Sequence, residues 1–344
     1  MIRRVPDLGA TFQGSLVETG RQPSIVPPRV VGAMRRLALT GAIATGLSLG
    51  TLAYAHWESR QPVLRRYQIP VAPREGFTRL RILHVSDLHM FPGQEFITRF
   101  LRQVSEREEI DLVISTGDNL GDADSLDQLL AAYEPLLAYP GAFVLGSNDY
   151  YSPQTKSWIS YLKPNRSATA TKRHRRTVPD LPWMELVEHL GAAGWKDLSN
   201  RSDSILVQDQ ALTVALMGVD DPHIRRDRMP TPPASWLEPG AVRLGLTHAP
   251  YLRVVNEMVR EQADLVLAGH THGGQVRVPG LGAVITNSDL PRQYASGMHV
   301  WGDQPAGSGP SWLHVSAGLG TSPFAPIRFA CPPEASLIEL VPAD

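Results

Sequence analysis

The sequence predicts an α/β fold, and three observations support that class. From about residue 78, short apolar runs alternate with segments of helical spacing. Nearly every run ends in a small polar cluster rather than a hairpin turn. The composition, 42% hydrophobic and 19% charged over 344 residues, is that of a folded chain. Strands separated by helices form right-handed crossovers, which give a sheet with parallel strands.

The elements of the first half alternate regularly. Strands are expected at 80–85, 111–115 and 142–145, and helices at 96–104 and 126–137. The second half adds further strands and one helix near 251–262; the strands are 212–219, 241–246 and 263–268. Beyond Gly273 the chain shows only short β-like pieces, which predict a second sheet rather than more crossovers: 275–278, 284–286, 299–301, 312–316 and 336–341.

The N-terminal region precedes this alternation and differs from it. Residues 1–33, rich in Pro, Gly, Ser and Arg, are expected to be a disordered tail. Leu37–Ala55 contains nineteen residues without a charge, just enough for a bilayer core, so 34–57 is predicted as a membrane anchor. The alternatives are an export signal cleaved after Ala53-Tyr54-Ala55 and a buried helix. Residues 58–77 are expected to be a linker. The protein is expected to be anchored by this single span, with its domain on the extracytoplasmic face of the membrane. The alternative is export from the cell after cleavage of the signal.

Charge and cysteine content limit the partners. Lys and Arg number 33 against 34 Asp and Glu, so nucleic acid is not an expected partner. The basic insertion at 150–179 has seven Lys/Arg and no acid; it is either a solvated loop or a surface for anionic lipid or a phosphorylated substrate. The single cysteine, Cys331, excludes an intramolecular disulfide and a cysteine-based zinc cluster. Any metal must therefore be held by histidine and carboxylate.

Five polar clusters follow predicted strands, where a parallel sheet gathers its ligands. They are Asp87-Leu88-His89, Gly117-Asp118-Asn119, Gly146-Ser147-Asn148-Asp149, Thr247-His248-Ala249-Pro250 and Gly269-His270-Thr271-His272-Gly273-Gly274-Gln275. Together they bring four histidines, with Asp87 and Asp118, to one edge. Imidazole and carboxylate suit Mn, Fe, Zn or Ni, and a carboxylate can bridge two ions. The sequence therefore predicts a metal site.

In order and spacing, these residues resemble the calcineurin-like metallophosphoesterase superfamily, whose motifs are D-x-H, G-D-x, G-N-H-[DE], a later H and G-H-x-H. The resemblance covers residues 78–342, and Asp220-Asp221-Pro222-His223 and Gly318-Leu319-Gly320-Thr321-Ser322 are similar to its bacterial YkuE and YaeI branch. It implies a four-layer α/β/β/α sandwich. It also implies two metal ions, of unknown identity among Mn, Fe, Zn and Ni, whose bridging hydroxide hydrolyses phosphate monoesters, diesters or pyrophosphates. Because this branch tends to act near membranes, a phospholipid or lipid-linked substrate is expected.

The resemblance also assigns residues. The expected metal ligands are Asp87, His89, Asp118, Asn148, His248, His270 and His272, with Asp118 as the bridge. The third motif departs from the family, because the sequence carries neither its Asn ligand nor its His acid in register. We expect Asn148 to be the ligand, with Ser147 or water as the alternative, in which case Asn148 binds phosphate. The catalytic candidates are Asn148 and His223, and the substrate-binding candidates are Asn119 and Arg292. A catalytically weak, metal-binding sensor or scaffold at the membrane is the rival function.

Overall fold

The computed structural model describes residues 48–153, 178–207, 212–302 and 310–343. The chain separates into two units, 1–50 and 51–344, and of the first only the helical residues 48–50 are described. The predicted tail, most of the predicted anchor and most of the basic insertion lie outside the described residues. Within the described ranges, no helix has both the length and the apolar character that crossing a bilayer requires.

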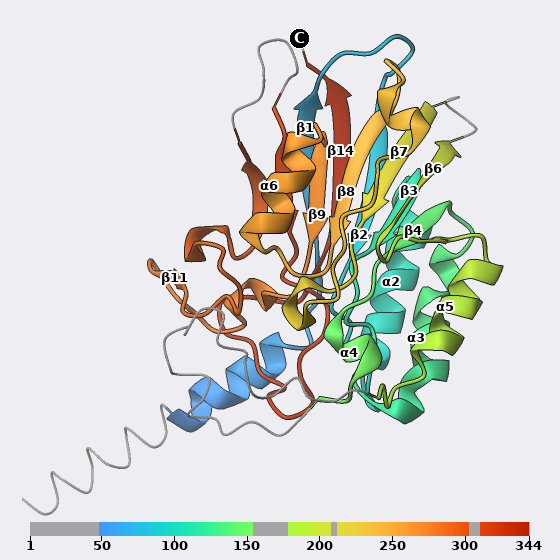
Figure 1. Ribbon diagram of the computed structural model, residues 1–344. Helices are drawn as coiled ribbons and strands as arrows, with labels where there is room; N and C mark the ends of the chain where they lie inside the picture. Colours follow the sequence, from blue (N-terminus) through green and yellow to red (C-terminus); the bar gives the residue numbers. More distant parts are fainter. Residues whose placement is uncertain (1–47, 154–177, 208–211, 303–309, 344) are drawn as a thin grey trace, which may run out of the picture. The chain divides into compact units, whose positions relative to one another are not determined.

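The second unit is built on two six-stranded sheets, with parallel and antiparallel neighbours in each (Figure 1). The first sheet runs β1 (Val63–Val71), β14 (Glu334–Pro342), β2 (Leu80–Val85), β3 (Leu112–Ser115), β4 (Gly141–Phe143) and β5 (Lys196–Asp197). The second runs β12 (Gly297–Val300), β13 (Trp312–Val315), β9 (Leu265–Ala268), β8 (Val242–Thr247), β7 (Leu212–Gly218) and β6 (Arg201–Val207). A two-stranded hairpin, β10 (Arg277–Val278) and β11 (Gly282–Ala283), stands apart.

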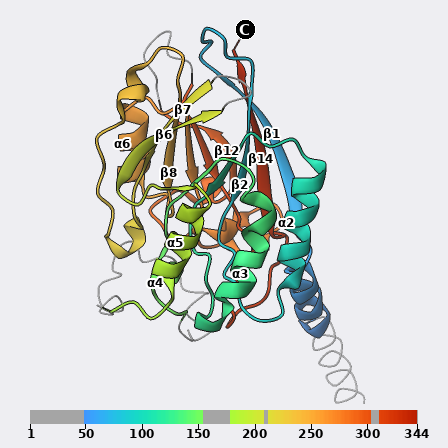
Figure 2. The same ribbon diagram turned by 90° about the vertical axis from the view of Figure 1, so that its right-hand side faces the viewer.

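Helices cover the outer faces of the two sheets (Figures 1 and 2). On the first sheet these are α2 (Glu95–Arg107), α3 (Leu126–Tyr133) and α5 (Trp183–Ala192); on the second it is α6 (Leu252–Arg260). The short elements are α4 (Ser147–Tyr150), η1 (Ala123–Ser125), η2 (Glu134–Leu136), η5 (Pro222–Ile224), η6 (Ala234–Leu237), η7 (His272–Gly274) and η8 (Arg292–Tyr294). A further helical stretch, residues 48–58, carries no label in Figure 1.

Three apolar clusters separate the layers. Ile82 and Ile114 of the first sheet meet Leu244 of the second in the cluster between the sheets. Their neighbours Leu83 and Val113 point outward to the helices α2, α3 and α5, and a third cluster packs α6 on the second sheet. Strands buried on both faces read as continuous apolar runs. The predicted four-layer α/β/β/α sandwich is confirmed.

Two predictions about strands are wrong. Residues 58–77, expected to be a linker, contain β1, which pairs in parallel with β14 along nine residues. The strand was missed because the exposed Arg65 and Arg66 interrupt its apolar pattern, and charged residues of this kind are common in edge strands. The second sheet is also not formed only from the pieces after Gly273: β7, β8 and β9 belong to it, whereas β14 lies in the first sheet between β1 and β2.

Candidate metal centre

Six of the predicted ligands lie where four strands of the two sheets end. Asp87 and His89 follow β2, Asp118 follows β3, His248 follows β8, and His270 and His272 follow β9. At least 92% of the surface of each of the first five is buried, and His272 is partly exposed. The carboxyl ends of strands from both sheets therefore converge on one point, as expected for a ligand site of parallel strands.

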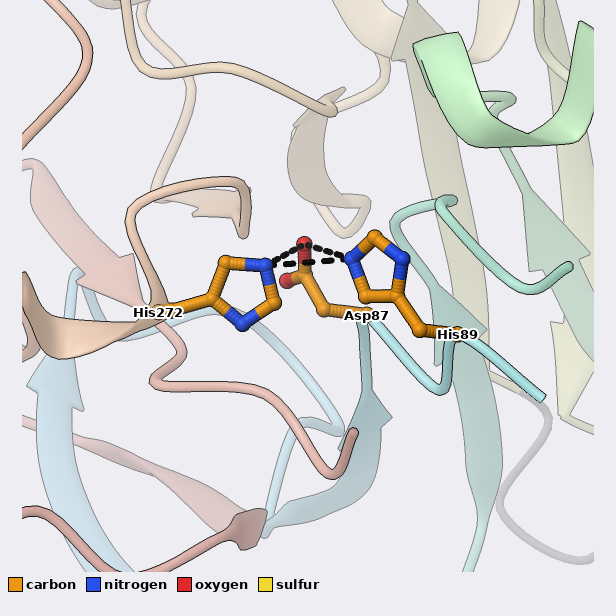
Figure 3. A group of neighbouring side chains, drawn as sticks. All are labelled: Asp87, His89 and His272. Carbon is orange, nitrogen blue, oxygen red and sulfur yellow. Dashed lines mark hydrogen bonds and ion pairs between the residues drawn. The ribbon is translucent and has the colours of Figure 1, made fainter. Parts of the chain in front are cut away.

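The first group consists of Asp87, His89 and His272, with all ligand atoms within 4.8 Å of one another. Figure 3 shows the Asp87 carboxylate next to the two imidazole rings. Oδ1 of Asp87 lies 3.6 Å from Nε2 of His272 and 4.0 Å from Nε2 of His89, and the two Nε2 atoms are 3.1 Å apart. Three donor atoms from two distant loops thus point at the same small volume.

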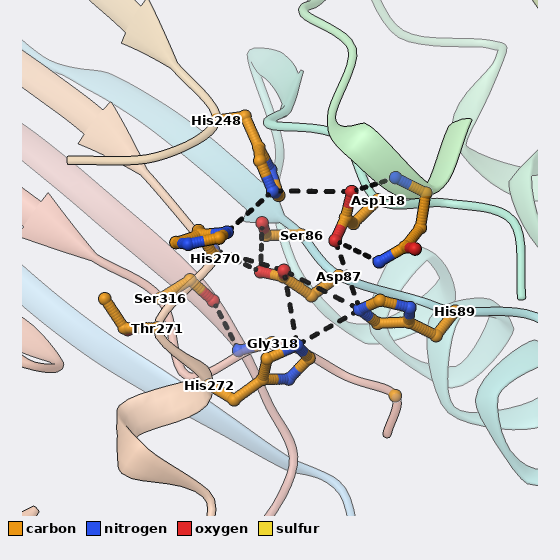
Figure 4. Close-up of polar contacts among 12 residues, drawn as sticks. Ser86, Asp87, His89, Asp118, His248, His270, Thr271, His272, Ser316 and Gly318 are labelled. Atoms are coloured by element: carbon orange, nitrogen blue, oxygen red, sulfur yellow. Dashed lines mark hydrogen bonds and ion pairs between the residues drawn. The ribbon is translucent and has the colours of Figure 1, made fainter. Parts of the chain in front are cut away.

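The second group consists of Asp118, His248 and His270. Nε2 of His248 lies 3.4 Å from Oδ1 of Asp118 and 3.3 Å from Nδ1 of His270. The other carboxylate oxygen of Asp118, Oδ2, lies 3.4 Å from Nε2 of His89, a member of the first group (Figure 4). The two oxygens of Asp118 therefore face different groups, which is the arrangement that a bridging carboxylate needs.

The backbone at these positions is strained. Among the described residues, eleven that are not glycine have positive φ, and five of them are Asp87, His89, Asp118, His270 and His272. Such conformations are uncommon for side-chain-bearing residues, and they concentrate at functional sites. Two glycines permit close approach here: a Cβ at Gly146 would overlap Oδ1 of Asp118, and one at Gly269 would overlap Ser86 and Asp87.

Charge at the centre is set by burial and by pairing. Burial opposes ionisation of Asp118, but the positive charges of His248 and His89 hold its pKa well below the usual range. Burial also opposes protonation of His248, but Asp118 raises its pKa well above the usual range. Burial, aided by neighbouring histidines, lowers the pKa of His270 and His272 well below the usual range, so both are neutral near pH 7 and keep a lone pair for a ligand.

The donor set fits divalent metal ions. Imidazole nitrogens and carboxylate oxygens converge in both groups without a cysteine, and every residue of the two groups is buried except His272, which is partly exposed. In addition, Oδ2 of the fully buried Asp221 has no hydrogen-bond partner in the described part of the chain. Buried polar atoms of folded proteins are normally paired, so this oxygen, on a residue that interacts electrostatically with His248 and Asp118, is suited to a bound cation.

The family model for calcineurin-like phosphoesterases matches residues 80–274, more than half of the chain. The chain belongs to this family. It is 26% identical over 302 residues to an uncharacterized metallophosphoesterase of Aquifex aeolicus, which covers 84% of this chain and 95% of that protein. It is 32% identical over 154 residues to Phosphodiesterase YaeI of Escherichia coli, covering 45% and 50%, and 27% identical over 280 residues to a transmembrane protein with metallophosphoesterase domain of Bos taurus, covering 75% and 56%.

Membership in the calcineurin-like phosphoesterases makes the protein a metal-dependent phosphoester hydrolase. The predicted resemblance to this superfamily, with YaeI among the relatives, is confirmed. The family and the two residue groups agree on divalent metal as the cofactor.

In this phosphoesterase, the third motif reaches the metal centre through Asn148. Its backbone N donates to Oδ1 of Asp118 at 2.7 Å, and its side-chain Nδ2 donates to Oδ2 at 2.8 Å. Asp149 holds the same turn: its carboxylate accepts from the backbone N–H groups of Gly146, Asp118 and Asn119. Burial raises the pKa of Asp149 to about 6. Asn148 therefore orients the Asp118 carboxylate, and Asp149 fixes the backbone of Asp118.

The remaining sequence candidates have different outcomes. The His223 ring lies 4.5 Å from the His270 ring, centroid to centroid, and its Nδ1 lies 3.1 Å from the Tyr251 hydroxyl, so it sits beside the second group. Asn119 is corrected: it is fully buried, and its side-chain oxygen accepts from Tyr133 and Ser115 in the core rather than facing substrate. Arg292 is exposed, and its role stays a prediction.

Sequence reasoning missed several residues that shape the centre. Asp221, quoted only as part of a motif, is fully buried, and burial raises its pKa to about 7. Arg328 is fully buried near His272, with Nη2 donating to the carbonyls of Ala317, Gly318 and Gly320 at 2.7–3.0 Å. It thereby fixes the loop whose Gly320 N–H donates to the carbonyl of Asp87. The acidic motif around Asp221 could have indicated a role at the centre, whereas no sequence motif near Arg328 indicated one.

A buried polar chain also fixes Asp87 from the inside of the sandwich. The Ser86 hydroxyl donates to Oδ2 of Asp87 at 2.7 Å, and Thr116 donates to Ser86 at 2.7 Å. His84 lies 2.9 Å from Thr116 and 2.8 Å from His314 of the opposite sheet. His84 and His314 alternate with apolar neighbours along β2 and β13, which hides these two histidines within apolar runs.

Proposed function

We propose that this phosphoesterase hydrolyses phosphodiesters with two metal ions, one at each group. The observation that carries the proposal is the Asp118 carboxylate, whose Oδ1 and Oδ2 each lie 3.4 Å from a histidine of a different group. Asp87, His89 and His272 would hold the first ion, and His248 and His270 the second, with Asp118 shared. When bound, two such ions neutralise charge on phosphoryl oxygens and lower the pKa of water toward neutrality.

The protein's own groups keep this arrangement in place. Asn148 and Asp149 fix the bridging carboxylate from one side. Ser86 and the backbone N–H of His270 fix the carboxylate of Asp87, the latter at 3.0–3.1 Å. Because both aspartates are preorganised, little reorganisation is needed when negative charge develops on the phosphoryl oxygens. In an ungapped match to the third motif, Asn148 stands where the family has its histidine acid, and an amide cannot donate a proton as an acid near neutral pH.

We assign the proton donor to His223. Its ring packs against His270, and Tyr251 lies within hydrogen-bond distance of its Nδ1. A general acid contributes about 10²–10⁴-fold, most for leaving groups of high pKa. His223→Gln should therefore leave hydrolysis of p-nitrophenyl esters nearly unchanged and slow that of alkyl phosphodiesters. Equal losses on both would contradict the assignment.

A membrane phosphodiester is the proposed substrate class, with the enzyme anchored by its N-terminal segment on the extracytoplasmic face. The uncharged stretch Leu37–Ala55 supports the anchor. The names of two relatives, a phosphodiesterase and a transmembrane protein with this domain, point the same way. Export after signal cleavage is the alternative, and N-terminal sequencing of the membrane and soluble fractions would distinguish the two.

The decisive experiment measures turnover and metal in one sample. The full chain, purified in detergent and supplied with Mn²⁺, should hydrolyse bis-p-nitrophenyl phosphate faster than p-nitrophenyl phosphate. Asp118→Asn should abolish turnover and reduce bound metal, whereas the exposed Asp124→Asn should change neither. Wild-type protein that binds metal without turning over any ester would instead favour the sensor or scaffold.

A further inference from the structure

We propose that three connected segments next to the metal centre form a membrane-contact surface, and that its partner is a phospholipid bilayer. The segments are the helical residues 51–57, the hairpin 276–284 and the loop 323–327. The part of this proposal in which the surface brings lipid substrate to the metal centre rests on the proposed phosphodiesterase function. The part in which the surface binds a bilayer does not depend on that function. It places the His272 side of the metal centre at the level of lipid headgroups.

The helical residues 51–57 are mostly apolar and mostly not covered by protein. They include no Asp, Glu, Lys or Arg, and of the seven only Ala55 is buried. Leu52, Tyr54 and Trp57 expose 54%, 45% and 56% of their surfaces. A helix without a charged face is normally buried in protein or lipid. Water is thus an unfavourable environment for this helix.

The hairpin has an apolar tip. Residues 278–282, Val-Pro-Gly-Leu-Gly, are all exposed and include no polar side chain. Leu281 exposes 82% of its surface. Turns are usually built with polar residues, and a run of exposed apolar residues indicates a functional contact.

The three segments are joined to one another. The Tyr54 ring packs against Phe329 at 5.7 Å between centroids, and Val276 forms a β-bridge with Phe329. The Gln275 amide donates to the carbonyls of Ala325 and Ile327. In the described part of the second unit, eight exposed large hydrophobic residues lie in the three segments and five are scattered elsewhere. Single exposed apolar residues are ordinary, but a contiguous patch marks an interaction site.

This surface is also continuous with the metal centre. Arg328, one residue beyond the loop 323–327, has Nη2 3.5 Å from Nδ1 of His272. Glu58, at the end of the helix, accepts from the backbone N–H groups of Ala330 and Cys331, and the Cys331 thiol lies 3.4 Å from the His272 carbonyl. A group held at this surface is therefore delivered to the same loop that carries a ligand of the first metal group.

Two features favour a bilayer over a protein partner. The apolar character does not stop at residue 51, because the sequence contains no charge as far back as Leu37. The surface also has exposed tyrosine and tryptophan, which concentrate at membrane interfaces, and its three segments contain one arginine and no acidic residue. A surface without negative charge can approach anionic headgroups.

Site-specific labelling tests the contact directly. The sole cysteine, Cys331, is 97% buried, so Leu281→Cys can be labelled with an environment-sensitive fluorophore, with unsubstituted protein as the blank. Leu237→Cys is a matched control, since Leu237 exposes 83% of its surface and lies in η6. In vesicles of phosphatidylcholine and phosphatidylglycerol, brominated lipid should quench the label at 281 and not at 237. Equal quenching at the two positions would overturn the proposal. Absence of quenching at 281 would also overturn it, including the case in which the label reports an apolar environment that brominated lipid does not quench, because the surface would then be covered by protein.

A second experiment tests delivery of substrate. Leu281→Asp should lower hydrolysis of the p-nitrophenyl ester of phosphatidic acid in vesicles by at least about tenfold. Hydrolysis of soluble bis-p-nitrophenyl phosphate, which has the same leaving group, should not change. Phe324→Asp should behave alike and Leu237→Asp should affect neither substrate. If wild type hydrolyses neither ester, the proposed function fails while the quenching result still decides the surface; equal losses on both esters would refute delivery.

Discussion

Replacing Asn148 by alanine separates the two assignments that the third motif allows. Asn148→Ala keeps the backbone hydrogen bond to Oδ1 of Asp118 and removes the 2.8 Å side-chain bond to Oδ2. A hydrogen bond to a charged acceptor contributes about 1.5–3 kcal/mol. Since about 1.4 kcal/mol is a factor of ten, metal affinity or kcat/KM should fall by about 10- to 150-fold. Loss of a direct bond from Asn148 to metal would add to this figure.

The assay compares this variant with Ser147→Ala, which alters the neighbouring residue of the same turn. Metal affinity is measured by competition with a chromophoric chelator, and kcat/KM with bis-p-nitrophenyl phosphate. Circular dichroism checks that both variants are folded. Asn148→Ala should show the loss, and Ser147→Ala should stay within about twofold of wild type. The reverse order would refute the role of Asn148, and unchanged metal affinity with reduced kcat would place Asn148 on the phosphate.

Three further predictions concern the surroundings of the centre. Gly269→Ala places a Cβ against Ser86 and Asp87, so kcat/KM should drop by about 10²-fold; near-normal activity would show that the loop can shift. Arg328→Met leaves three carbonyls without a charged donor and should lower the unfolding free energy in urea by about 3 kcal/mol or more; a loss below about 1 kcal/mol would contradict this. Burial lowers the pKa of His314, which therefore takes up a proton below pH about 6.5 only when unfolded. Stability is thus lost as pH falls, and the slope of that loss contributed by His314 approaches about 1.4 kcal/mol per pH unit near pH 5. His314→Asn should remove this contribution in denaturation curves measured from pH 7 to 5; parallel curves for variant and wild type would exclude the effect.

The sequence predicted the inner strands, and the convergence of the polar residues that follow them, for a physical reason. Strands buried on both faces, such as β2 and β3, must be apolar along their whole length. The polar residues that follow, such as Asp87 and Asp118, then stand out at the sheet edge. Neither signal depends on knowing which distant segment lies alongside.

What was missed depends on distant pairing or on side-chain direction. β1 exposes polar residues, and its partner β14 is about 270 residues away in the sequence. Arg328 and Glu58 look like ordinary surface charges until the loop and helix that they tie together are in place. Asn119 was expected to bind substrate, but its side chain is fully buried and its oxygen accepts from Tyr133 and Ser115 in the core. The local sequence pattern predicts where a polar residue stands along the chain, but it does not predict the direction in which its side chain points.

The place of β14 between β1 and β2 has a consequence for biosynthesis. His84 of β2 pairs with Ser336 of β14, about 250 residues later. At about 5–20 residues per second, a ribosome needs roughly 12–50 s to translate that interval. Throughout this time β1 has no β14 to pair with and one side of β2 stays open, so a nascent chain displays two unpaired strand edges. A chaperone that shields those edges during translation would therefore raise the yield of active enzyme more than one that acts after release.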